Sequence, residues 1–386
     1  MKTSSLITFL TIALAIYGSV NLYIGIRGWQ SFPHGSSARW YFLAAFLFVS
    51  LSFIAGRFME RASMTLGSYI FVWIGSVWLA VMVYAFMAVL ALDILRTINH
   101  FLPFFPDVIA QNYAKAKQIT ALSISGLVAV VVAVGYINAM ATNIQTLDLT
   151  IPKGANGRKD ITIVAASDMH LGTIIGRWRC NSLVEQINGL KPDLILLAGD
   201  IVDEDLGRVV QQNLGEELSR LDAPLGVYGI NGNHEYIGGV ERADAYLRDH
   251  GITMLRDSVV TLDGGISLVG RDDRSANWGG GPGRKPLEVL MASVDKSLPV
   301  ILMDHQPFGL GEGVANGVDL QLSGHTHHGQ LWPFNYITDR IYEVSRGYKK
   351  IGNTNVYVST GFGTWGPPVR LGNRPEIVKI TLHFRP

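Results

Sequence analysis

The sequence predicts a two-part protein, an N-terminal all-α membrane bundle of about four spans followed by an α/β domain. Charged residues make up 16% of the 386 residues, against roughly 25% in typical soluble domains. Only 11 of the 63 Asp, Glu, Lys and Arg residues precede position 141, so the deficit lies in the N-terminal part. After that position, short apolar runs alternate with amphipathic ones, which is typical of α/β domains. We therefore expect a helical membrane domain over 1–140, a linker over 141–160 and a soluble domain over 161–386.

Four apolar stretches account for the predicted spans. They cover residues 6–26, 40–55, 66–92 and 119–140. Because a helix rises about 1.5 Å per residue, about 20 residues cross the hydrocarbon core. The second stretch is short, but Arg57 at its end can extend its charged head to the interface. We therefore expect an integral multi-pass membrane protein with membrane lipid as a partner. In a bacterium we expect it in the cytoplasmic membrane.

Charged residues near these stretches bear on the topology of the predicted bundle. Lys2 followed by an apolar run also fits a cleaved signal peptide, but the run continues without a small-residue cleavage site, so we interpret it as an anchor. Asp93, near the end of the third stretch, is expected at the membrane interface rather than inside it. Lys and Arg number six on one side of the predicted bundle and five on the other. The positive-inside rule therefore assigns no membrane face to the soluble domain.

Charge and cysteine content exclude several classes of protein. A net charge of +1 provides no basic field for nucleic acid, so no nucleic acid partner is expected. A single cysteine, Cys180, cannot form an internal disulfide or a thiolate-cluster metal site. We interpret Cys180 as an ordinary helix residue.

The soluble part shows five short apolar runs that predict buried strands. They cover residues 161–166, 193–198, 226–230, 299–303 and 318–323. Helical spacing occupies the segments 177–190, 205–221 and 240–250. This alternation predicts parallel strands, and ligands of such sheets gather beyond the carboxyl ends of the strands.

Each of the five predicted strands is followed by His, Asp or Asn. The residues are, in chain order, Asp168, His170, Asp200, Asn233, His234, His305, His325, His327 and His328. In extended backbone, residues i and i+2 project to the same side, so Asp168 and His170 are expected to converge, as are His325 and His327. Taken singly, each could be an ordinary polar residue at a strand end. Together they form a mixed oxygen and imidazole set that suits Mn, Fe or Zn, with enough ligands for two ions.

The ordered series D-x-H, G-D, G-N-H-E, H and G-H-x-H resembles the calcineurin-like metallophosphoesterase superfamily, from residue 161 to the C-terminus. LSGHTHHGQ and GFGTWGPPVRLGNRPEI further resemble its membrane-anchored subgroup, transmembrane proteins with a metallophosphoesterase domain. The resemblance implies an αββα sandwich and two divalent metal ions that activate water for attack on phosphorus. It implies one ion held by Asp168, His170 and His327 and another by Asn233, His305 and His325, with Asp200 between them. His234 would stabilise the phosphoryl oxygens or protonate the leaving group.

Further residues are candidates for supporting roles. Asp203 is a candidate neighbour of the ligands, and Glu235 is expected to support its loop. His328 stands where the subgroup usually has glycine and is a candidate substrate contact. Arg370 could meet a phosphate or an acidic surface neighbour.

Two other segments invite a functional interpretation. The G-x-G-x-x-G match over 361–366 is not expected to bind a dinucleotide, because two prolines follow where a helix would have to open. The segment 275–286 is expected to be a loop, in which Trp278 and Arg284 could contact substrate or pack on the surface.

These features predict a metal-dependent phosphohydrolase of phosphodiester or pyrophosphate bonds. A membrane anchor raises the effective concentration at the bilayer, which favours a lipid-linked substrate such as UDP-diacylglucosamine. Soluble nucleotides and phosphoproteins stay open as substrates, and no obligate protein partner is evident. A non-catalytic sensor or scaffold with a metal-stabilised domain is the alternative, although no residue of the ligand pattern is missing. A transporter is less favoured, since the spans show no paired charges in the sequence.

Overall fold

The computed structural model describes residues 3–279 and 283–385, and the chain forms two compact units. One unit contains the chain up to Ile137 together with Gly366–Val369. The other contains Asn138–Trp365 and the chain from Arg370 onward.

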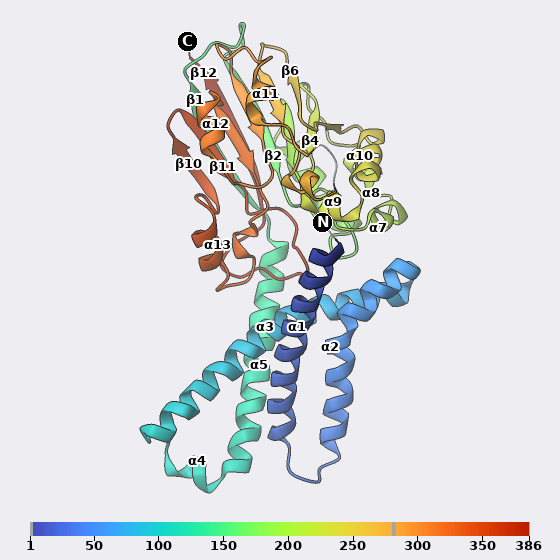
Figure 1. Ribbon diagram of the computed structural model, residues 1–386, viewed down its shortest axis with the longest axis vertical. Coiled ribbons are helices and arrows are strands. Elements are labelled where there is room, and N and C mark those ends of the chain that lie inside the picture. Colours follow the sequence, from blue (N-terminus) through green and yellow to red (C-terminus); the bar gives the residue numbers. More distant parts are fainter. Residues whose placement is uncertain (1–2, 280–282, 386) are drawn as a thin grey trace. The chain divides into compact units, whose positions relative to one another are not determined.

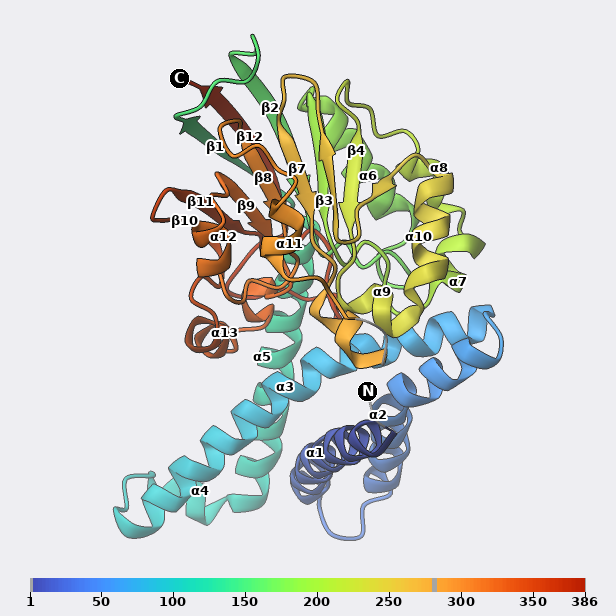
Figure 2. The same cartoon turned by 45° about the horizontal axis from the view of Figure 1, so that its top comes forward.

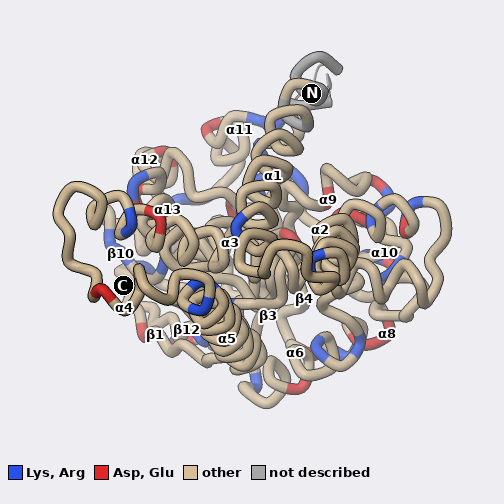
Figure 3. Tube along the Cα trace, turned by 90° about the horizontal axis from the view of Figure 1, so that it is seen from below, with Lys and Arg blue, Asp and Glu red and all other residues tan. Residues whose placement is uncertain are grey.

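The first unit is helical (Figure 1). Its elements are α1 (Thr3–Ser31), α2 (Ala38–Ala62), α3 (Leu66–Phe101), α4 (Asp107–Gln111) and α5 (Tyr113–Met140), whose last turn belongs to the second unit. In the described part of the chain, α2, α3 and α5 are long and apolar enough to cross a membrane, and they contain three of the four predicted stretches. The first predicted stretch lies in α1, where the side chains of residues 3–7, 9 and 10 lie outside the described part, so a fourth span stays a prediction. The traces of these helices carry few charged residues (Figure 3).

Small residues allow α2 and α3 to pack closely. A β-carbon at Gly75 would overlap the backbone of Phe53, and one at Gly56 would overlap the backbone of Val72. Ser52 and Ser76 are also buried in this contact region. Association through small residues is typical of membrane helices, in which the hydrophobic effect does not hold helices together.

Asp93 of α3 forms ion pairs with Arg27 of α1 at 2.7 Å and with Arg96 at 3.4 Å. The sequence did not reveal the pair with Arg27, because Arg27 and Asp93 are far apart in the chain. The pair ties the end of α1 to α3.

The second unit is built from two six-stranded sheets. The first has the order β1-β12-β2-β3-β4-β5 and the second the order β10-β11-β9-β8-β7-β6. The strands of the first sheet are β1 (Asn143–Ile151), β2 (Asp160–Ala166), β3 (Leu194–Ala198), β4 (Val227–Ile230), β5 (Thr253–Met254) and β12 (Glu376–Phe384). Those of the second are β6 (Ser258–Thr261), β7 (Ser267–Gly270), β8 (Val300–Met303), β9 (Leu320–Ser323), β10 (Gly347–Ile351) and β11 (Thr354–Val358).

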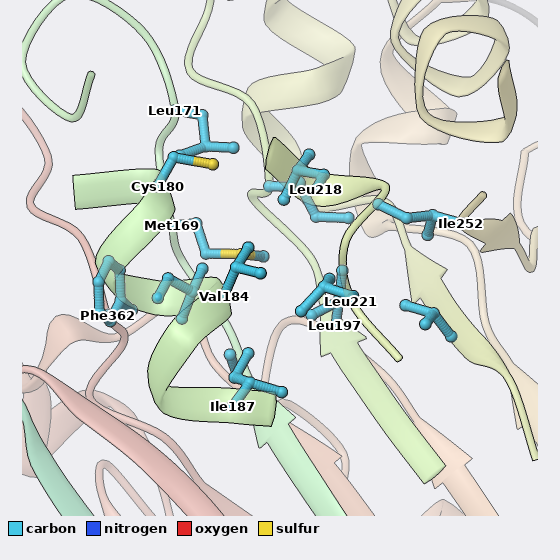
Figure 4. Packing of buried hydrophobic residues seen from close by; sticks show 14 of the residues in the cluster. Met169, Leu171, Cys180, Val184, Ile187, Leu197, Leu218, Leu221, Ile252 and Phe362 are labelled. Atoms are coloured by element: carbon cyan, nitrogen blue, oxygen red, sulfur yellow. The ribbon is translucent and has the colours of Figure 1, made fainter. Parts of the chain in front are cut away.

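Helices lie on the outer faces of the two sheets and at one end of them (Figure 2). They are α6 (Arg177–Gly189), α7 (Leu206–Gln211), α8 (Leu214–Leu218), α9 (Asn233–Gly238), α10 (Val240–Asp249), α11 (Leu287–Met291), α12 (Gly311–Ala315) and α13 (Asn335–Ile341), with short 3-10 turns η1 (Arg274–Gly279) and η2 (His327–Gly329). One buried cluster joins Ile163 and Leu196 of the first sheet to Ile301 of the second, so the sheets pack face to face. A second cluster joins the first sheet to α6 and α8 through Val184, Ile187 and Leu218 (Figure 4). This is the αββα arrangement that the resemblance implies.

The structure differs from the sequence prediction in four respects, the first being that β5, β6, β7, β10, β11 and β12 are not among the five predicted strands. About half of the predicted linker is in the first sheet, because β1 covers residues 143–151 and pairs in parallel with β12. One predicted helix over 205–221 is two helices, α7 and α8, because Asn213 between them has a left-handed φ of 53°. The first sheet is mixed rather than all-parallel, since β12 runs antiparallel to β2. β1 pairs on one side only and alternates in exposure, so it lacks the continuous apolar run that marks a buried strand.

Candidate metal centre

The residues that follow β2, β3, β4, β8 and β9 converge at one end of the sandwich. They form two clusters of closely spaced donor atoms, and a third group, His170, Asp203 and His234, shares His170 with the first; each of the three could hold a metal ion. The first contains Asp168, His170 and His327, and the second Asp200, His305 and His325. The strands of both sheets thus supply one polar centre.

In the first cluster, three buried side chains point at one another. The Nε2 atoms of His170 and His327 are 2.9 Å apart, and the Nε2 of His327 is 3.5 Å from a carboxylate oxygen of Asp168. Burial lowers the pKa of His170 to about 3, so its ring is neutral and offers a lone pair. Burial also raises the pKa of Asp168 to about 6. The three donor groups are thus arranged like the ligands of a bound cation.

In the second cluster, an imidazole faces a carboxylate. His305 donates its Nδ1 hydrogen to Ala198 O at 2.8 Å, and its Nε2 atom faces Asp200 Oδ2, 3.2 Å away. Burial favours the neutral ring, but the negative charges of Asp200 and Asp168 outweigh it and raise the pKa of His305 well above its ordinary value. A histidine that donates one ring N–H to a backbone carbonyl and presents the other nitrogen is typical of metal ligands. Nearby, the Oδ1 atom of Asn233 is buried and accepts no hydrogen bond within the described residues. Unpaired buried acceptors of this kind fit a divalent metal ion.

Asp200 lies between the clusters. Its Oδ2 atom is 3.2 Å from His305 Nε2 and 3.9 Å from His170 Nε2. One carboxylate oxygen therefore approaches donors of both clusters, which is the position of a bridging ligand.

The donors converge through left-handed backbone turns rather than extended strands. Asp168 and His170 have φ values of 50° and 47°, and His325 and His327 have values of 70° and 44°. The expectation that extended i, i+2 geometry brings each pair together was therefore wrong in its geometry. Non-glycine residues at positive φ are strained, and such strain gathers at functional sites because the surrounding structure has to hold it.

His234 lies at the rim of the first cluster and is held by Asp203. Its Nδ1 atom is 3.1 Å from Asp203 Oδ1, and its backbone N–H donates to Asp200 Oδ1 at 2.9 Å. Burial favours the neutral ring, but the negative charges of Asp200 and Asp203 outweigh it and raise the pKa of His234 to about 9. At neutral pH the His234 ring is therefore in its protonated imidazolium form, next to the donor clusters.

Glu235 supports the loop, as its position in the sequence indicates. Its carboxylate accepts the backbone N–H groups of Asp200, Val202 and Gly232 at 3.2, 2.8 and 2.7 Å. It therefore fixes the backbone on both sides of Asp200 and does not point at the donor clusters.

Arg370 is buried, and its guanidinium contacts neither a surface carboxylate nor solvent. Its guanidinium donates to the carbonyls of Thr360, Gly361 and Gly363, and its Nη2 atom is 3.3 Å from His327 Nδ1. Arg370 thus holds the loop behind His327, which differs from both contacts expected from the sequence.

Asn373, which sequence reasoning did not single out, also holds the His327 turn. Its Nδ2 atom donates to the carbonyls of His327 and His328. Its only sequence signal is its place in the LGNRPEI part of the resemblance. The His328 ring is buried with Nδ1 3.0 Å from Ser345 Oγ.

In the described part of the 275–286 loop, Arg284 lies beside Asp304. Arg284 donates to Asp304 at 2.9 Å, so its guanidinium is engaged in an ion pair. The side chain of Trp278 lies outside the described part of the chain.

Exposed apolar side chains surround α13, which packs against the η2 turn that carries His327. We call these residues the α13 rim: Trp332, Phe334, Tyr336, Ile337 and Ile341, with exposures of 38–62%. Trp365 is 57% exposed, and its ring centre is 6.4 Å from that of His234. Clustered exposed aromatic and aliphatic residues mark surfaces that meet protein, membrane or an apolar ligand.

Comparisons with known proteins place these residues in a family. The family model described as calcineurin-like phosphoesterase matches residues 161–329. An uncharacterized metallophosphoesterase of Aquifex aeolicus is 36% identical over 235 residues, covering 60% of this chain and 87% of that protein. One from Helicobacter pylori is 34% identical over 232 residues, covering 58% of this chain and 60% of that protein.

A relative from zebrafish carries the name transmembrane protein with metallophosphoesterase domain. It is 32% identical over 279 residues, covering 69% of this chain and 62% of that protein. The matches thus span less than two thirds of the length of the Helicobacter and zebrafish relatives.

Proposed function

The chain belongs to the calcineurin-like metallophosphoesterase family and is a multi-pass membrane protein, and on this premise we propose that it hydrolyses phosphodiester or pyrophosphate bonds with two divalent metal ions. The observation that carries the proposal is the pair of donor clusters with the Asp200 carboxylate between them. Two ions about 3.5–4 Å apart form the clamp that stabilises both oxygens of a phosphoryl displacement.

The proposal takes its ligands from the donor clusters and the neighbouring Asn233. Asp168, His170 and His327 would hold one ion and Asn233, His305 and His325 the other, with Asp200 between them. Mn, Fe and Zn all suit this mixture of imidazole and oxygen donors. When bound, the ions supply Lewis-acid stabilisation of the phosphate and lower the pKa of water to make a nucleophile at neutral pH.

His234 acts as the proton donor in this proposal. Asp203 fixes the ring through Nδ1, so Nε2 is left for the substrate, and the raised pKa of about 9 keeps the ring protonated at neutral pH. A group with these properties protonates the alkoxide or phosphate that leaves, a contribution of about 10²- to 10⁴-fold in rate.

The surroundings of the site favour a lipid-linked substrate, for which UDP-diacylglucosamine is our specific proposal. The α13 rim and Trp365 present apolar and aromatic surface next to the clusters. A site for a water-soluble nucleotide would instead present polar side chains there. Because the chain is anchored in a membrane, a lipid-linked phosphate also reaches the site at high effective concentration.

The test compares the full-length protein in detergent, loaded with Mn, with its Asn233→Ala variant and with Asn353→Ala as a matched control. Asn353 is an exposed residue between β10 and β11. Each protein is incubated with a lipid extract doped with UDP-diacylglucosamine and, separately, with an aryl phosphodiester. Lipid masses and aryl release are measured.

We expect the unchanged protein and the control to cleave both substrates and Asn233→Ala to cleave neither. Cleavage of the aryl ester with intact lipids would refute the lipid substrate and leave the phosphoesterase. Metal-loaded protein that cleaves neither substrate would refute the proposed hydrolysis in favour of a sensor.

A further inference from the structure

A polar cleft of about 770 Å³ lies in the second unit, and none of the proposed metal ligands lines it. The edge strands of the two sheets, β1 and β10, flank it, and residues 372–376 close it. Its volume is within the range of about 300–1,000 Å³ that small-molecule sites have. The cleft is therefore large enough for a ligand of its own.

The free charge in the cleft is positive. Arg346 and Arg374 line it, both are exposed, and within the described residues neither side chain forms an ion pair or hydrogen bond. Glu376 also lines it but is 5% exposed, and its carboxylate accepts hydrogen bonds from Thr360 N at 2.9 Å and Tyr357 Oη at 3.2 Å. Unpaired guanidinium groups bind phosphate in a bidentate manner, so the cleft suits a phosphate group.

The end of helix α5 fixes the depth of the cleft in the membrane. Asn138, in the last turn of α5, lines the cleft and donates to the carbonyls of Arg370 and Asn373 at 3.0 and 2.7 Å. A helix of 28 residues is about 42 Å long, close to the 40–45 Å of a bilayer with its headgroup regions. An α5 that crosses a bilayer therefore brings its last turn, with Asn138 of the cleft, to headgroup depth.

The α13 rim supports this placement independently. Its exposed Trp, Tyr and Phe side chains are the residues that gather at membrane–water interfaces. The rim ends at Ile341, and Arg346 follows five residues later, at the start of β10. Aromatic residues beside basic ones are typical of surfaces that lie on an anionic bilayer.

From the free arginines, the depth and the rim, we propose that the cleft binds the phosphate headgroup of an anionic membrane phospholipid. The two guanidinium groups contact the phosphate, and the acyl chains extend into the bilayer. This site is separate from the metal centre and does not depend on the hydrolysis proposed above.

The experiment measures lipid binding to full-length protein in detergent by native mass spectrometry. The probes are dioctanoyl-phosphatidylglycerol, dioctanoyl-phosphatidylcholine and inorganic phosphate. A chelator is present throughout, so that metal-dependent phosphate binding at the metal centre does not contribute. The double variant Arg346→Gln/Arg374→Gln is compared with Arg242→Gln/Lys296→Gln, which removes two exposed charges on α10 and after α11, away from the cleft.

We expect the unchanged protein and the control to bind phosphatidylglycerol more tightly than phosphatidylcholine. Each interfacial arginine contributes about fivefold, so the Arg346/Arg374 variant should bind phosphatidylglycerol about 10- to 30-fold more weakly. Equal affinity for the two lipids, or an unchanged affinity of the double variant, would overturn the proposal. Inorganic phosphate bound as tightly as phosphatidylglycerol would also overturn it, in favour of a free-phosphate site.

Discussion

The Nε2 atoms of His170 and His327 lie 2.9 Å apart, although 157 positions separate the residues in the chain. Burial lowers the pKa of both rings, so both are neutral at neutral pH, and the tautomer of each ring decides which of its nitrogens keeps a hydrogen. Two imidazole ligands that bind one ion at about 2.0–2.1 Å and at right angles have this separation. The distance fits two ligands of one metal ion, and in the protein alone it is that of an N–H···N hydrogen bond between two neutral rings.

Asp200→Asn should reduce the bound metal at both positions. The substitution removes the charge of a carboxylate whose Oδ2 atom approaches both clusters, 3.2 Å from His305 and 3.9 Å from His170. Metal content measured by mass spectrometry should fall well below that of Asp222→Asn, which changes an exposed carboxylate. If Asp200→Asn loses one ion and retains the other at full occupancy, Asp200 does not bridge.

Asp203→Asn should shift the alkaline side of the pH–rate profile to lower pH. Burial alone lowers the pKa of His234, and the charges of Asp200 and Asp203 raise it to about 9. Removing one charge lowers that pKa by about one unit, so protonated His234 and the rate decline at lower pH. His234→Gln should remove the alkaline decline altogether. An Asp203→Asn profile that overlays that of the unchanged protein would contradict this role.

Glu217→Gln should lower the thermal unfolding midpoint by about 1–4 °C at pH 7 and by less at pH 3. Hydrogen bonds from Arg177 at 2.9 Å and Arg220 at 2.6 Å outweigh burial and lower the pKa of Glu217. A carboxyl group with a lowered folded-state pKa stabilises the fold above its unfolded pKa of about 4.3. That stability is lost as the pH falls through the folded-state value.

Glu216→Gln is the matched control for this prediction. Glu216 is exposed on the same helix and accepts from Asn213 Nδ2, which a glutamine oxygen can also do. A midpoint difference between Glu217→Gln and the unchanged protein that stays constant from pH 7 to pH 3 would contradict the ionic contribution.

Gly75→Val should destabilise the membrane bundle. A β-carbon at Gly75 would overlap the backbone of Phe53 in α2, so α2 and α3 would have to separate. Detergent-extracted yield and midpoint should fall relative to Gly126→Val, because Gly126 in α5 has open space around its β-carbon position. Equal stability of the two variants would show that α2 and α3 do not pack closely at Gly75.

The sequence predicted most of the candidate centre because its residues follow strands that are easy to recognise. β2, β3, β4, β8 and β9 are continuous apolar runs, and each is followed by a polar motif of the resemblance. Asn373 and the buried position of Arg370 were not predictable, because both act through backbone carbonyls that only the folded loop brings near. The same reason explains β1, whose pairing with the distant β12 gives no local signal.

The sequence by itself determined that the chain has an apolar helical part and an α/β part, and which residue types gather at strand ends. These properties depend on local patterning, namely apolar runs, their spacing and the motifs between them. Only the tertiary structure decided how the donors meet, since left-handed turns at Asp168, His170, His325 and His327 orient them. It also decided that Arg346 and Arg374 share a cleft with the last turn of α5, because that arrangement joins segments more than 200 residues apart.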